Sequence, residues 1–224
     1  MVISDRKPMS EILGFLKDAN KIILVGCNQC AAAVKTGGEP ELEEMKVLLE
    51  AEGKEVLGYI LPNTACNLML GKKELKALKD ELKDADAILS LACGDGTQTI
   101  VKNVQKQNIP VYPANNTLFI GEVERVGKFK EACRACGECE LGWTGGICPV
   151  TMCAKGLING ACGGAKNGKC EVDPDNDCAW IQIYERLKNL DQLDNLLEVR
   201  EPKDYSKQLN PRRHSINKKA ESEA

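Results

Sequence analysis

The sequence predicts an α/β fold, in which a small parallel-sheet domain of βαβ units is followed by a cysteine-rich, metal-stapled domain with a C-terminal helix. Two observations lead to this prediction. Short apolar runs alternate with amphipathic stretches through residues 9–114, and this alternation is typical of parallel strands joined by crossover helices. Eight of the twelve cysteines then fall within residues 133–178, where glycine is frequent and large apolar side chains are too few to build a core.

Four apolar runs are expected to be the strands of the sheet. The first is a continuous β-branched run of the kind that is buried on both faces of a parallel sheet. The other three follow it at intervals that leave room for a helix. The four expected strands are residues 21–26 (KIILVG), 55–61 (EVLGYIL), 87–92 (AILSLA) and 109–114 (IPVYPA).

Apolar residues at helical spacing predict the helices between and around these strands. The last expected helix carries Trp180, Ile183 and Leu187 on one face, where they are expected to serve in packing. The expected helices are residues 9–20, a helix that opens around Cys30, and residues 40–53, 72–85, 97–107 and 179–197.

The alternation of strands and helices ends before the cysteine-rich segment, and this sets the expected domain boundaries. Residues 1–125 are expected to form the α/β domain, residues 126–195 the cysteine-rich domain with its helix, and residues 196–224 a polar tail. The end of this tail, residues 200–224, has almost no apolar side chains, so it is either disordered or an arm that becomes ordered on a partner. The single histidine, His214, has no companions and receives no role.

Charge and composition exclude several classes of protein. A net charge of −3 and a pI near 5.5 argue against non-specific nucleic-acid binding, which needs a basic surface. No apolar run reaches the length of a membrane span, and the first residues lack the basic-then-apolar order of a secretory signal. We therefore expect a cytoplasmic protein, whose thiols stay reduced and serve as metal ligands or redox groups.

Four cysteines of the α/β part follow the ends of expected strands. Cys27, Cys66 and Cys93 each lie just past a strand, and Cys30 is one helical turn after Cys27. Because the carboxyl ends of parallel strands meet at one edge of a sheet, we expect the four to form one thiolate site that holds an iron–sulfur cluster. The alternative is that they pack as small hydrophobic residues. Residues 94–97 (GDGT) lack the remaining features of a nucleotide-binding fingerprint, so we expect a tight turn beside the thiols.

The spacing of the next cysteines favours metal binding. Cys133-x-x-Cys136-x-x-Cys139 places three thiols in one loop, and Cys148 is followed by Pro149. Bacterial ferredoxin-type clusters use this spacing and often end with Cys-Pro. Zinc alone would cross-link the segment equally well, and disulfides are the third alternative. The prediction is thiolate-bound metal, with iron–sulfur preferred over zinc.

The eight cysteines of this segment are expected to divide into two sets of four. Cys133, Cys136 and Cys139 share one centre, whose fourth ligand is either Cys148 or Cys178, since ferredoxin-like runs often lend a cysteine to a second cluster. The second centre takes the rest, which are Cys153, Cys162, Cys170 and the unused member of that pair.

Several motifs, in order along the chain, carry a family resemblance. They resemble the MetV-type subunits of methylenetetrahydrofolate reductase, known for their C-terminal cysteine-rich segment, and the resemblance covers about residues 10–190. The motifs are GCNQCAAAVKTGG (26–38), SLACGDGTQT (90–99), CGECELGWTGGICPVTMCAKGLINGACGG (136–164) and CAWIQIYERL (178–187).

The resemblance implies an electron-transfer subunit of methylenetetrahydrofolate reductase that is not catalytic alone. It implies two or three [4Fe–4S] clusters, with zinc as a possible occupant of one site, and a MetF-type partner whose TIM barrel carries the flavin, FMN or FAD. Ferredoxin or another low-potential donor would supply the electrons. About four strands are expected here, not the eight of a TIM barrel, so the catalytic barrel belongs to another chain. The alternative is a zinc-stabilised docking subunit of the same complex, without redox chemistry.

Overall fold

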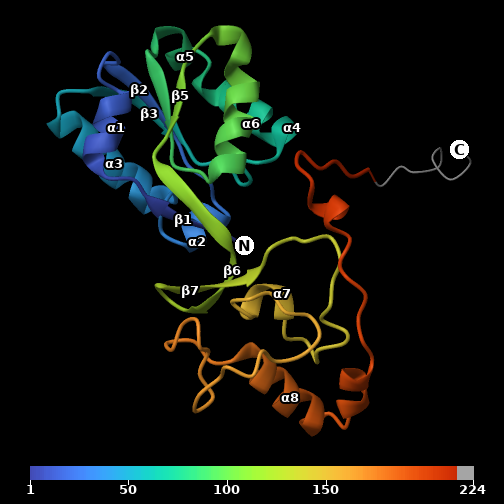
Figure 1. The fold of residues 1–224 in the computed structure, drawn as a ribbon. Coiled ribbons are helices and arrows are strands. Elements are labelled where there is room, and N and C mark those ends of the chain that lie inside the picture. Colours follow the sequence, from blue (N-terminus) through green and yellow to red (C-terminus); the bar gives the residue numbers. More distant parts are fainter. Residues whose placement is uncertain (216–224) are drawn as a thin grey trace, which may run out of the picture. The chain divides into compact units, whose positions relative to one another are not determined.

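The computed structural model describes residues 1–215, which form two compact units that divide between Lys130 and Glu131 (Figure 1). The first unit holds the α/β part of the chain. The second holds eight cysteines and the last α-helix of the chain described, α8 (Ala179–Asn189). Among the described residues, no helix has the length and apolar character that crossing a membrane requires.

A four-stranded parallel sheet forms the centre of the first unit, as the sequence predicts. Val25 at the end of β2 pairs with Ile60 on one side and with Ser90 on the other. The neighbouring strands therefore end together at one edge of the sheet. The strands in spatial order are β3 (Glu55–Ile60), β2 (Lys21–Val25), β4 (Ala87–Ser90) and β5 (Val111–Pro113).

Helices cover both faces of this sheet (Figure 1). On one face, Ile12, Leu42 and Met45 pack with Leu24 of β2. On the other face, Leu75, Leu82 and Ile100 pack with Ile23 and Val25. Side chains of β2 thus alternate between two cores. The helices of the first face are α1 (Met9–Phe15) and α3 (Glu39–Ala51), and those of the second are α4 (Leu68–Glu74), α5 (Glu81–Asp84) and α6 (Gly94–Val104).

The expected helix over residues 72–85 is broken into three pieces. Between α4 and α5 the chain forms a 3₁₀ helix, η1 (Leu75–Leu78). A 3₁₀ turn has three residues, so it brings Leu75 and Leu78 over one another, and both leucines are buried against the sheet. Burial of both leucines therefore favours a 3₁₀ turn over a continuous α-helix at this point.

A second sheet was not expected from the sequence. It is three-stranded, and β1 pairs antiparallel with β6. Gly127 lies between β6 and β7 with a φ of +78°, a conformation that glycine adopts readily in hairpin turns. β7 ends at Cys133, where the cysteine-rich segment begins. The strands are β1 (Val2–Arg6), β6 (Asn115–Arg125) and β7 (Lys128–Cys133).

The second unit has a small apolar core. Trp180, Ile183 and Leu187 of α8 are buried together, with Ile147 and Leu193 packed against them. The expected helix over residues 179–197 ends at Asn189, and a 3₁₀ helix follows. The other elements of this unit are α7 (Pro149–Met152), η3 (Leu193–Leu197) and η4 (Tyr205–Gln208). So small a core needs additional cross-links to be stable.

Candidate functional site

All twelve cysteines are free thiols in the structure. Within residues 1–215, no three Cys, His, Asp or Glu side chains converge as they would around a bound metal. The position of each cysteine in the fold therefore defines the candidate sites. The cysteines fall into three regions: the edge of the parallel sheet, a cavity beside α8, and a loop after β7.

At the edge of the sheet, two of the expected thiols lie near enough to Cys66 to influence its charge. Cys27 follows β2 and Cys93 follows β4, and both are buried. Burial raises the pKa of the Cys66 thiol, and the nearby negative groups Asp95, Cys93 and Cys27 raise it further. Cys66 therefore lies within electrostatic reach of both Cys27 and Cys93. Cys30 begins α2 (Cys30–Ala33), one turn after Cys27.

Close backbone approaches hold the turn that carries Cys27. The amide of Cys27 donates to the carbonyl of Gly37 at 2.9 Å. A Cβ atom on Gly37 would lie 1.9 Å from the carbonyl oxygen of Leu91, so only glycine fits there. The buried Asn115 donates its amide to the carbonyls of Leu91 at 2.6 Å and of Thr36 at 3.2 Å. The turn after β2 is thus fixed to the end of β4.

A second close approach places Cys66 near Cys93. A Cβ atom on Gly96 would lie 2.8 Å from Cβ of Ala92 and 3.2 Å from Cβ of Ala65. Glycine in the first turn of α6 therefore lets the segment with Cys66 lie against it. Cys93 is the N-cap residue of α6, so its backbone lies at the start of that helix.

The second region is a cavity in the second unit that is lined by four cysteines. Its volume is about 20 Å³. Cys178 is the N-cap residue of α8, and Glu171 lies beside Cys162 with its carboxylate 3.3 Å from the sulfur. Glu171 also pairs with Lys155, and these two neighbours, Lys155 first, lower the pKa of its carboxyl. The four cysteines are Cys153, Cys162, Cys170 and Cys178.

The third region is the loop that follows β7. Ala135 and Gly137 both have a positive φ, of 50° and 82°, and the chain turns tightly between Cys133, Cys136 and Cys139. The amide of Ala135 donates to the sulfur of Cys133 at 3.2 Å. The sequence left Cys148 and Cys178 as alternatives for the fourth position. The structure places Cys178 among the residues that line the cavity of the second region, and Cys148 directly precedes α7.

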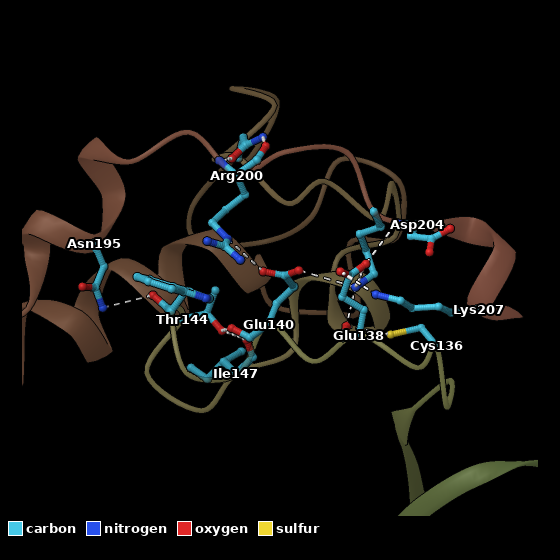
Figure 2. Close-up of polar contacts among 12 residues, drawn as sticks. Cys136, Glu138, Glu140, Thr144, Ile147, Asn195, Arg200, Asp204 and Lys207 are labelled. Carbon is cyan, nitrogen blue, oxygen red and sulfur yellow. Dashed lines mark hydrogen bonds and ion pairs between the residues drawn. The ribbon is translucent and has the colours of Figure 1, made fainter. Parts of the chain in front are cut away.

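Residues after 198, expected as a polar tail, make specific contacts with this loop (Figure 2). Arg200 pairs with Glu140 at 3.3 Å, and Lys207 pairs with Glu138 at 3.1 Å. The amide of Asp204, followed by Lys207, lowers the pKa of the Glu138 carboxyl. The sequence shows only alternating charges here, with no signal that they pair across 60 residues or more. Residues 216–224 of the expected tail lie outside the described part of the chain.

The donor set of the three regions fits a soft metal. Every candidate ligand is a thiol, and thiolates select zinc and iron–sulfur clusters over hard cations such as magnesium or calcium. Four cysteines are among the residues that line the cavity beside α8, and four is the ligand number of a closed zinc site or a cubane cluster. The other two regions offer the same ligand type.

Comparison with known proteins identifies the cysteine-rich part. Residues 112–206 match the family described as "Methylene-tetrahydrofolate reductase C terminal". This match covers less than half of the chain but includes all eight cysteines of the second unit, and it confirms the family resemblance over that segment. For residues 10–111 the resemblance stays a prediction.

The other comparisons add little. No curated protein matches the chain. Among solved structures, a crystal structure of arylmalonate decarboxylase is similar with a TM-score of 0.33 and 16% identity, over 47% of this chain and 44% of that chain. The chain thus spans less than half the length of that structure, and a likeness this low carries no functional conclusion.

Proposed function

We propose that this chain, whose residues 112–206 match the methylene-tetrahydrofolate reductase C-terminal family, is an electron-transfer subunit of a methylenetetrahydrofolate reductase. It would work with a flavin-bearing, MetF-type catalytic subunit and receive electrons from ferredoxin or another low-potential donor. The family match supports the association with the reductase. The three groups of thiols support the redox role.

The cysteines would hold the metal centres, and [4Fe–4S] clusters bound there would supply low-potential one-electron carriers. Cys27, Cys30, Cys66 and Cys93 would form the ligand set at the sheet edge. The loop after β7 would provide Cys133, Cys136 and Cys139, with Cys148. The third set lines the cavity beside α8 and consists of Cys153, Cys162, Cys170 and Cys178.

The protein would contribute burial, hydrogen bonds and a helix dipole to parts of these sites. At the sheet edge, Cys27 and Cys93 are buried, and the start of α6 carries the positive end of a helix dipole. In the second unit, the indole of Trp180 lines the cavity with the four cysteines and donates to the carbonyl of Leu157 at 3.0 Å. Burial and hydrogen bonds of this kind tune the reduction potential of a bound cluster.

The observation that carries the proposal is the concentration of eight of the twelve cysteines inside the segment that matches the family. The test is a reconstituted complex of this chain with its flavin subunit under anaerobic conditions. A low-potential donor should reduce the flavin quickly with the wild-type chain and slowly with the Cys93→Ser chain or with the flavin subunit alone. Equal rates in all three would refute the redox role.

A second function has one observation in its favour. The cavity beside α8 measures about 20 Å³, and a space of that size holds roughly one water-sized sphere. This suits a single zinc ion better than a four-iron cluster. As the alternative, we propose that this site binds zinc. If the other sites bind zinc as well, the chain is a zinc-stabilised docking subunit without redox chemistry. Metal analysis that finds zinc and no iron would favour it.

A further inference from the structure

The loop after β7 makes few hydrogen bonds within itself. We call residues 133–139 the CxxCxxC loop. Within residues 1–215, the backbone of residues 134–139 makes no hydrogen bond to another backbone group. Backbone carbonyls that leave water need a partner, so other groups must supply the donors that fix this conformation.

Cationic side chains of a later segment supply those donors. Lys203 donates to the carbonyl of Glu138, and Arg212 donates to the carbonyl of Ala135. Lys207 donates to the Glu138 carboxylate at 3.1 Å. Three cations that follow the helix α8 thus reach the short stretch between Cys133 and Cys139, and Figure 2 shows Lys207 directed at Glu138 beside Cys136.

The fit between the two segments is also steric. Gly137 has a φ of +82°, and a Cβ atom there would lie 3.2 Å from Cβ and 3.3 Å from the carbonyl oxygen of Lys207. The backbones therefore approach closely at the middle of the loop. Lys203 is buried with 3% of its side chain exposed, which a lysine tolerates only when its charge is paired. Its partners exist only while the two segments lie together.

We infer that residues 200–212 are a clamp that positions the CxxCxxC loop, with Lys203, Lys207 and Arg212 as its positioning residues. The clamp holds the turn between the cysteines in one conformation before any metal binds. Without it, the loop would have to be ordered by the metal itself, at the expense of binding affinity. This role goes beyond the proposed electron transfer and holds whichever metal the thiols take.

The test uses the full chain, reduced and freed of metal with a chelator. Lys207→Met, Arg212→Met and the double variant remove exposed members of the clamp. Lys188→Met and Arg213→Met are matched controls, because neither side chain pairs with a described residue. Two quantities are measured by mass spectrometry: the alkylation rates of Cys136 and Cys139 in the loop, and hydrogen exchange of the amides within α8.

The clamp predicts an effect confined to the loop. Loss of two hydrogen bonds from charged donors should raise the alkylation rates of Cys136 and Cys139 about tenfold in the double variant. Exchange within α8 should stay unchanged, and both controls should match the wild type. Unchanged alkylation of both cysteines would overturn the inference. A rise of hydrogen exchange in α8 would overturn it as well, because the segment would then support the whole unit. Neither outcome depends on flavin reduction.

Discussion

The Nζ atom of Lys203 lies 3.4 Å from a carboxylate oxygen of Glu140, and the two side chains are 3% and 5% exposed. Breaking so buried an ion pair leaves an uncompensated charge, whereas removing both partners costs much less. We expect Lys203→Met to lower the free energy of unfolding by about 3 kcal/mol. The double variant that also carries Glu140→Met should lose less unfolding free energy than the two single variants lose together.

Urea unfolding of the four proteins in this cycle gives the coupling energy. Each single variant leaves the remaining charge a second partner, because Arg200 also pairs with Glu140 and Glu138 also pairs with Lys203, so the two single losses should be similar. Additive losses in the double variant would show that the two charges do not interact.

The backbone of Gly37 lies very close to Leu91 beside the turn with Cys27. Adding one methyl group at Gly37 should therefore strongly destabilise the fold. In Gly37→Ala, the new Cβ atom would lie 1.9 Å from the backbone oxygen of Leu91, so the turn or the end of β4 must shift. We expect a loss of about 3 kcal/mol or more, as for other overpacked sites. Thermal unfolding of the variant measures it.

Gly14→Ala is the matched control for this prediction. A Cβ atom on Gly14 meets nothing within 4 Å, and Gly14 lies in α1. Alanine is the better helix former, so this variant should gain about 0.5–1 kcal/mol. Equal stability of the two variants would contradict the close approach at Gly37.

The Asp86 carboxylate, at the start of the parallel sheet, should make the stability of the fold depend on pH. The Asp86 carboxylate accepts from the amides of Lys21 at 2.8 Å and Asn20 at 2.9 Å. These bonds, Lys21 first, lower the pKa of Asp86 from its usual 3.8. A carboxyl with a lowered folded-state pKa stabilises the fold above its unfolded-state pKa, and this stabilisation is lost as the pH falls through the folded-state value.

Urea midpoints between pH 7 and pH 3 test this assignment. The wild type should lose more stability than Asp86→Asn as the pH falls below about 4, because the asparagine has no charge to lose. Parallel curves for the two proteins would rule out a contribution of Asp86.

The grouping of cysteines predicts which serine variants share a phenotype. Cys170→Ser and Cys178→Ser should each remove the metal of the cavity beside α8. Cys136→Ser and Cys148→Ser should remove a different one. Metal stoichiometry of each purified variant measures this, and a loss common to Cys178→Ser and Cys136→Ser would mean that the grouping is wrong.

Much of the α/β unit could be predicted from the sequence because its signals are local. The continuous run at residues 21–25 is buried on both sides as a parallel strand should be. The placement of Cys27 and Cys93 beyond strand ends followed from the topology alone. The strands β6 and β7 were missed because mixed alternation around Gly127 is a weaker signal than a β-branched run.

The clamp could not be predicted, because its contacts depend on partners far apart in the chain. Lys203 and Glu140 are 63 residues apart, and each alone resembles an ordinary surface charge. Each charge can be buried because the other pairs with it, and the residues next to it in the sequence give no sign of this. The choice between Cys148 and Cys178 was open for a similar reason, since glycine-rich loops carry no periodic signal.

The metal content of the anaerobically purified chain, measured as iron, zinc and acid-labile sulfide with EPR spectra before and after reduction, tests the central claim most directly. The proposed function predicts iron and sulfide in amounts sufficient for two or three clusters, and an EPR signal that appears on reduction. Protein that is colourless and free of iron, from a preparation kept strictly without oxygen, would contradict it.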